Sequence, residues 1–106
     1  MKFLFLIQVP EGAHPAAPGD GDPTVWLEET SSRRLLGNQT ADWSTAKTVR
    51  IRGGKTLVTD GPFAETKDAI AGFDVIECGS VEEALEIAAG HPVAAFGAVE
   101  IRPFVE

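Results

Sequence analysis

The 106-residue chain has few of the side chains that build cross-links and metal sites. Cys78 is its single cysteine, so a disulfide within the chain and a cysteine-based metal cluster are both excluded. The two histidines, His14 and His91, form no His-x-His or His-x₃-His pair. Walker and G-x-G-x-x-G patterns are also missing. We therefore expect no metal and no cofactor, and the single cysteine fits a reducing cytoplasm.

Positive charge is scarce as well: nine Lys and Arg against 16 Asp and Glu give a net charge of −7 at pH 7. Nucleic acid and anionic membrane surfaces both require a basic footprint, so neither is expected as a partner. The apolar stretch at residues 2–9 is too short to span a membrane and lacks a signal-peptide cleavage pattern. A chain of this length is expected to form a single domain over residues 1–106.

The first half of the chain predicts a strand, a loop and a helix. Residues 2–9 alternate so that Phe3 and Phe5 face one way and Leu4 and Leu6 the other, which is typical of a strand buried on both faces.

A Pro- and Gly-rich loop should follow at residues 10–22. Asp22-Pro23 is typical of a helix start, and we expect the helix to run from Pro23 to about Arg34. A short strand is expected within residues 35–43. The candidate core contacts of this region are Val25, Trp26 and Leu36.

The middle of the chain predicts a hairpin. Residues 48–52 and 55–59 are rich in strand-forming side chains and flank Gly53-Gly54, which suits a turn of type I′ or II′. A tight turn follows, and one helical turn is expected over residues 64–70.

The last third predicts a strand, a capped helix and a strand. Residues 73–78 form the first strand, and Ser80 with Glu83 forms a capping box for the helix. Gly90 and Pro92 should end this helix, and residues 97–104 form the last strand.

This order of elements predicts an α+β protein with a ferredoxin-like βαββαβ fold and the hairpin as an insertion. In the last strand Val99 and Ile101 face one side, while Glu100 and Arg102 face the other. The helices must cover the apolar face. The opposite face mixes apolar side chains with a charged pair, so a second sheet docked on it would enclose a partly polar space. The pattern thus favours a homodimer, a dimeric α+β barrel.

Residues 60–67, Asp-Gly-Pro-Phe-Ala-Glu-Thr-Lys, resemble the signature of the DGPF group of the YCII-related family. The resemblance covers residues 48–106, and it implies small dimeric α+β barrel proteins, most of them without an established reaction. In the better-known YCII branch a histidine on the first helix is proposed to pair with an aspartate as acid and base. The helix expected at residues 23–34 has no histidine, so that role is not carried over.

The turn at residues 60–62 aims three charged side chains, Asp60, Glu65 and Lys67, at one region. Asp60 is the candidate catalytic group, a carboxylate able to exchange a proton at a cleft edge. Alternatively, its oxygens could accept backbone N–H groups within the turn. The candidate ligand-binding residues are Phe63, Glu65, Lys67, Glu100 and Arg102.

The roles of these charges have alternatives. Glu65 and Lys67 could instead form an exposed ion pair. Arg102 could clamp a ligand carboxylate, or neutralise Glu100 or Asp60 in a structural network.

Other notable residues have structural interpretations. His91 follows a helix end, where a cation is favourable to the helix dipole. Cys78 is expected to be a small buried side chain, and Trp26 and Trp43 to anchor the core or an interface.

Three functions remain open at this point. The leading one is a homodimer that binds a small polar molecule between its sheet and the turn at residues 60–67. The others are a cofactorless acid/base enzyme that uses Asp60, and a regulatory module that binds another protein through its acidic surface. The sequence leaves open the identity of the ligand and whether catalysis occurs.

Overall fold

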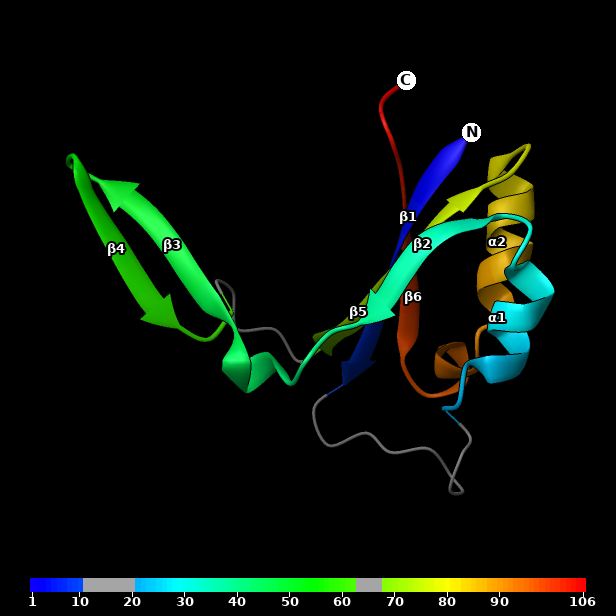
Figure 1. The fold of residues 1–106 in the computed structure, drawn as a ribbon, viewed down its shortest axis with the longest axis horizontal. Coiled ribbons are helices and arrows are strands. Elements are labelled where there is room, and N and C mark those ends of the chain that lie inside the picture. Colours follow the sequence, from blue (N-terminus) through cyan, green and yellow to red (C-terminus); the bar gives the residue numbers. More distant parts are fainter. Residues whose placement is uncertain (11–20, 63–67) are drawn as a thin grey trace.

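A computed structural model describes residues 1–10, 21–62 and 68–106, with the Asp68 side chain excepted. Figure 1 shows the fold. Within these ranges the elements in chain order are β1 (Lys2–Pro10), α1 (Thr24–Thr30), β2 (Arg34–Gln39), η1 (Trp43–Thr45), β3 (Lys47–Arg52), β4 (Lys55–Asp60), β5 (Asp68–Glu77), α2 (Val81–Ala89), η2 (Pro92–Ala95) and β6 (Ala98–Pro103).

Four strands form the main sheet in the order β2-β5-β1-β6, with antiparallel neighbours throughout. Both α-helices lie on one side of this sheet (Figure 1). The first and last strands are neighbours, as a ferredoxin-like order requires. The predicted α+β fold, βαββαβ with an inserted hairpin, is confirmed.

The core lies between the sheet and the helices. Phe3, Phe5 and Ile76 are fully buried there, and Val99 and Ile101 pack against them from β6, as expected. Apolar alternation along β1 places its phenylalanines on this side and its leucines on the other.

α2 begins as the sequence predicts. The Glu83 amide donates to Ser80 Oγ over 3.1 Å, while the Glu83 carboxylate accepts from the Gly79 amide over 2.9 Å rather than from the Ser80 amide. The helix buries Ala84, Ile87 and Ala88 and has Gly90 as its C-cap.

In the described part of the chain, no helix has the length and apolar character needed to cross a membrane.

α1 is shorter than expected. It ends at Thr30, whose hydroxyl donates to the Trp26 carbonyl over 2.8 Å, because the chain must turn to bring Arg34 opposite Ile76 at the sheet edge. The expectation of a helix reaching Arg34 is therefore wrong. The expected strand within residues 35–43 is confirmed as β2.

The core contacts expected in this region are only partly correct. Trp26 is buried, and its indole N–H donates to the Ile87 carbonyl over 2.8 Å, which ties α1 to α2. Val25 is 64% exposed and Leu36 is 55% exposed, so neither belongs to the core. Leu36 pairs with Val75 and therefore shares the sheet face opposite the helices.

β5 begins earlier than expected. Ala69 and Ile70 pair with Val9 and Gln8, so this part of the predicted helical turn over 64–70 is wrong; residues 63–67 lie outside the described residues. The ladder with β1 supplies these backbone groups with hydrogen bonds, which favours the strand over an isolated helical turn.

The predicted hairpin is confirmed, and β3 and β4 form a ribbon of two strands separate from the main sheet. Gly53 and Gly54 have φ values of 58° and 76°, the positive pair that a type I′ turn requires. The ribbon stands on the side of the sheet away from the helices (Figure 1). The radius of gyration is 15.6 Å, against about 13 Å for a compact domain of this length.

Candidate functional site

The sheet face opposite the helices, called the outer face below, carries a mixture of apolar and charged side chains. In the ladders Leu4 lies opposite Val75 and Arg102, and Leu6 lies opposite Phe73 and Glu100. Paired residues of antiparallel strands share a face. The outer face is therefore formed by Leu4, Leu6, Leu36, Phe73, Val75, Glu100 and Arg102.

This face is only half covered within one chain. Leu4, Leu6, Phe73 and Val75 are partly buried by their neighbours. Each strand that buries phenylalanine or isoleucine toward the helices also presents an apolar side chain on the outer face. One chain thus supplies two apolar layers and covers one of them fully.

Glu100 and Arg102 form an ion pair on the outer face, along the edge strand β6. Arg102 Nε donates to Glu100 Oε2 over 2.6 Å, and both side chains reach solvent. Of the arrangements predicted for Arg102, the structure has the pairing with Glu100. Because the bond uses Nε, the terminal guanidinium nitrogens keep N–H groups available to an acceptor from outside the described residues.

Asp60 lies at the base of the ribbon. Its side chain is 82% exposed and pairs with Lys47. The turn after it is closed by the Gly61 amide, which donates to the Ala46 carbonyl over 2.7 Å, and by Thr48 Oγ1, which donates to the Gly61 carbonyl over 2.8 Å. The turn is thus held by backbone and threonine groups, while the described partner of Asp60 is a lysine.

The sequence-predicted site residues are not gathered in one place by the described part of a single chain. Asp60 ends β4 in the ribbon, whereas Glu100 and Arg102 lie on β6 of the main sheet, and these two elements are well apart (Figure 1). Phe63, Glu65 and Lys67 lie outside the described residues. Their roles stay predictions.

A second polar cluster, which the sequence analysis did not select, lies on the helix side of the sheet. Asp74 is 5% exposed, and Arg34 Nε donates to its Oδ1 over 2.6 Å. The close approach of Arg34 to Asp74 depends on Gly37, since a Cβ at that position would lie 2.2 Å from Asp74 Oδ1. A usable signal existed: Asp74 occupies a core-facing position in the alternation of β5, where a carboxylate needs a partner.

His91 belongs to the same cluster. Burial lowers its pKa from the ordinary 6.5, an effect that the Asp74 charge only partly offsets. Burial also raises the pKa of Asp74, although the Arg34 hydrogen bond and charge oppose this. The His91 ring packs edge-on against Trp26 with centroids 4.7 Å apart.

The helix-dipole interpretation of His91 is wrong. The side chain is buried and its pKa is lowered, so it is neutral at pH 7 rather than a cation at the end of α2. Its Nδ1 accepts from the Val93 amide over 3.0 Å, which caps η2. Cys78, by contrast, is a free, buried thiol as expected. Trp43 is 48% exposed and does not enter the core.

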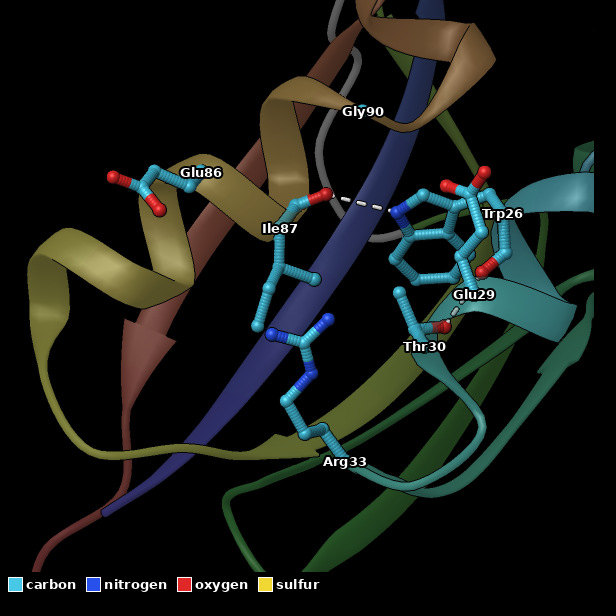
Figure 2. Close-up of a pocket in the computed structure, with 7 residues that line it drawn as sticks. All are labelled: Trp26, Glu29, Thr30, Arg33, Glu86, Ile87 and Gly90. Atoms are coloured by element: carbon cyan, nitrogen blue, oxygen red, sulfur yellow. Dashed lines mark hydrogen bonds between the residues drawn. The ribbon is translucent and has the colours of Figure 1, made fainter.

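A pocket of about 210 Å³ lies at the seam between α1 and α2 (Figure 2). Its lining residues are Trp26, Glu29, Thr30, Arg33, Glu86, Ile87 and Gly90. The bond from Trp26 to Ile87 spans it, and Glu86 points away from the other side chains (Figure 2). Since typical ligand pockets hold ~300–1,000 Å³, this hollow is a helix seam rather than the leading site.

Among the residues that the structure describes, no group of three or more His, Cys, Asp or Glu side chains is placed to hold an ion.

Comparisons with known proteins add a family and a fold. The sequence model of the YCII-related domain matches residues 1–106. An uncharacterized protein of Rhizobium meliloti (strain 1021) is 45% identical over 62 residues, which are 57% of this chain and 50% of that protein. The chain thus spans about half the length of this curated relative.

A solved structure has a similar fold. It is 5-chloro-2-hydroxyhydroquinone dehydrochlorinase from Burkholderia phenoliruptrix AC1100 in complex with 2,5-dihydroxybenzoquinone. The TM-score is 0.57 at 16% identity, over 99% of this chain and 94% of that one. At this identity the likeness concerns the fold alone.

Proposed function

Because the chain belongs to the YCII-related family, we propose that it binds a small polar molecule on its outer sheet face, in a cleft completed by a second copy of the chain. The observation that carries this proposal is the Glu100–Arg102 ion pair on the edge strand β6, beside the partly covered apolar side chains of β1. An apolar face alone would argue for a dry interface. A charged pair within it argues for a space that retains water or a ligand.

The energetics support a partly polar cleft. Burying the apolar part of the outer face contributes ~25 cal/mol per Å², which favours pairing of two sheets. Full burial of Glu100 and Arg102 would oppose this, because charges taken from water need further hydrogen bonds. A ligand with an anionic group can supply them at the terminal nitrogens of Arg102.

The same arrangement suggests the shape of the ligand. Leu4, Leu6 and Phe73 offer an apolar floor beside Arg102, which suits a small, flat molecule with an oxygen-rich rim. The structural neighbour is complexed with 2,5-dihydroxybenzoquinone, a molecule of that kind. The cleft is proposed to have further walls from Asp60, Phe63, Glu65 and Lys67.

The single cysteine supports a cytoplasmic setting for this function.

A thermal-shift screen of small metabolites tests the proposal without a prior guess of the compound, because a ligand at 100 times its Kd stabilises the folded state by about 2.7 kcal/mol. Hits are then titrated against Arg102→Met and Asp60→Asn. We expect at least a tenfold loss of affinity in Arg102→Met. Arg33→Met is the matched control, since Arg33 also pairs with a glutamate but lines the helix seam. Equal affinity of parent and Arg102→Met would contradict the outer-face site.

A second candidate is a cofactorless acid/base enzyme, and the buried cluster favours it. Asp74 with a raised pKa can hold a proton that an ordinary aspartate has lost, and neutral His91 can accept one. Arg34, only partly buried, connects the cluster to solvent. For Asp60 to act as the acid/base group, a second copy of the chain would have to form a cleft around it, because its side chain is exposed in a single chain.

The second candidate has its own test. Each hit is incubated with the protein and its conversion is followed by mass spectrometry. Turnover that is lost in Asp74→Asn and His91→Gln, with binding retained, would support the enzyme. Absence of any product from every hit would contradict it and leave a binding protein.

A further inference from the structure

The ribbon of β3 and β4 has no core of its own. Its register pairs Val49 with Val58 and Ile51 with Thr56, so these side chains share one side, called the apolar side below. Val49, Ile51 and Val58 are 62–64% exposed. A two-stranded hairpin alone is marginally stable in water. The ribbon therefore exposes an apolar surface that nothing described in its own chain covers.

The ribbon nevertheless has a defined base. The Gly61 amide donates a hydrogen bond to the Ala46 carbonyl, and Thr48 Oγ1 donates one to the Gly61 carbonyl. Lys47 forms an ion pair with Asp60. These contacts fix where the two strands leave the body. The ribbon then extends away from the main sheet, on the side opposite the helices (Figure 1).

Charge separates the ribbon from the rest of the chain. Residues 47–60 hold four of the nine cations and one of the 16 acidic residues, a net charge of +3. The remaining residues hold five cations and 15 acids, a net charge of −10. The surface that best complements the ribbon is therefore acidic, with apolar side chains still uncovered. The body of another copy of this chain has both properties.

We propose that the ribbon is an arm that docks its apolar side on a second copy of the chain, with Arg52 and Lys55 at its tip facing the acidic body of that copy. The proposal deepens the function proposed above and rests on its two-subunit cleft. Exchange is reciprocal, since each copy offers one arm and one body. An acidic protein of another kind is the competing occupant.

The docked arm also accounts for the separation of the candidate site residues. Asp60 lies at the arm's base, while Glu100 and Arg102 lie on the outer face. In one chain the ribbon and β6 do not meet (Figure 1). An exchanged arm brings Asp60 of one copy toward the cleft edge of the other, so the cleft is assembled from two chains.

Excision of the ribbon is the main experiment. The bond between Gly61 and Ala46 holds the ends together, so residues 47–60 can be replaced by two glycines. Sedimentation equilibrium of parent and excised protein should show a dimer for the parent and a dissociation constant at least tenfold weaker for the excised variant. A dimer of unchanged affinity would overturn the arm and leave the proposed cleft intact. A monomeric parent would overturn both.

Two point-variant pairs guard against misfolding of the excised protein. Val49→Thr with Val58→Thr keeps strand-forming shapes but removes apolar surface, and should weaken the dimer at least threefold. Val105→Thr, at a fully exposed valine outside the ribbon, is its control. Lys55→Glu should weaken the dimer more at low salt than at high salt. Lys2→Glu is its control, because it makes the same charge change away from the arm.

A photo-crosslinker at Ile51 identifies the occupant. Mixing ¹⁴N- and ¹⁵N-labelled protein should give crosslinked peptides of mixed label, which can arise only between copies. Crosslinks confined to one label within a dimeric sample would overturn the proposal. So would crosslinking in cell extract to a different acidic protein in preference to a second copy.

Discussion

The main sheet and the ribbon are both built from strands that have an apolar side, but that side is covered in the sheet and exposed in the ribbon. In the sheet, Phe3 and Phe5 are fully buried in a core that includes side chains of α1 and α2. In the ribbon, Val49 and Val58 lie opposite each other and are both 62% exposed. Alternation of side chains therefore predicts that a strand has an apolar side, but what covers that side depends on neighbours that the local sequence does not encode.

The comparison also separates two kinds of uncovered surface. The outer face belongs to strands that already have a core behind them, so it can stay partly solvated without loss of the fold. The ribbon has no such support and depends on its turn, its base and whatever it docks on. Stability variants should therefore affect the two regions very differently.

The largest effect is expected in the core. Phe5→Ala should cost about 3–5 kcal/mol of unfolding free energy, since a fully buried ring leaves a cavity. Val58→Ala on the ribbon should cost less than about 0.5 kcal/mol at protein concentrations that favour monomer. Urea unfolding followed by circular dichroism measures both. A cost for Val58→Ala close to that of Phe5→Ala would mean that the ribbon folds cooperatively with the sheet.

The next effect concerns the buried carboxylate. Arg34→Met should cost about 1–3 kcal/mol, because Asp74 would lose its cation and hydrogen-bond donor. The cost stays below that of a fully buried pair, since Asp74 can take up a proton. Arg33→Met is the control, and Arg34→Met combined with Asp74→Asn should recover part of the loss. Equal stability of the two arginine variants would contradict a structural role for this pair.

A smaller loss is expected at the start of α2. Ser80→Ala should cost ~1 kcal/mol, the usual cost of an N-cap. Ligand affinity should stay unchanged, because α2 covers the face opposite the proposed cleft. The denaturation midpoint and the ligand titration are measured on the same protein. Loss of binding with an unchanged midpoint would show that α2 and the cleft are not on opposite faces.

The smallest expected effect is on the pH dependence of the unfolding free energy. The pKa of His91 is lower in the folded chain than its ordinary 6.5, so the unfolded chain binds this proton first as the pH falls. Stability should therefore drop as the pH falls below about 6.5, and His91→Gln should remove this part of the slope. Asp74, with its raised pKa, contributes the opposite slope above its ordinary 3.8 in both proteins. His14→Gln is the control, and parallel curves for parent and His91→Gln would refute the assignment.

Much of the fold follows from the sequence because its signals are local. Gly53-Gly54 between two β-rich runs fixes the hairpin, and Ser80 with Glu83 fixes the start of α2. The family resemblance was likewise visible in the turn at residues 60–67 and is confirmed over the whole chain.

The errors arise where distant contacts decide. α1 stops at Thr30 because Arg34 is needed in the sheet, opposite Ile76. His91 is neutral because the sheet and Trp26 surround it, which its position after a helix does not reveal. The pairing of Arg34 with Asp74 joins residues 40 positions apart. The alternation of β5 marks Asp74 as a core-facing carboxylate, but no local pattern identifies Arg34 as its partner.

The two tryptophans offer a spectroscopic consequence of this architecture. The chain has no tyrosine, so emission excited at wavelengths that phenylalanine does not absorb comes from two indoles alone. Trp26 is 4% exposed and hydrogen-bonded between the helices, whereas Trp43 is 48% exposed in η1, just before the ribbon. The first should emit at short wavelength and be shielded from iodide, and the second should emit at long wavelength and be quenched. A single emission spectrum thus carries separate signals from the packed body and from the root of the ribbon, so subunit association and unfolding can be followed independently without any added label.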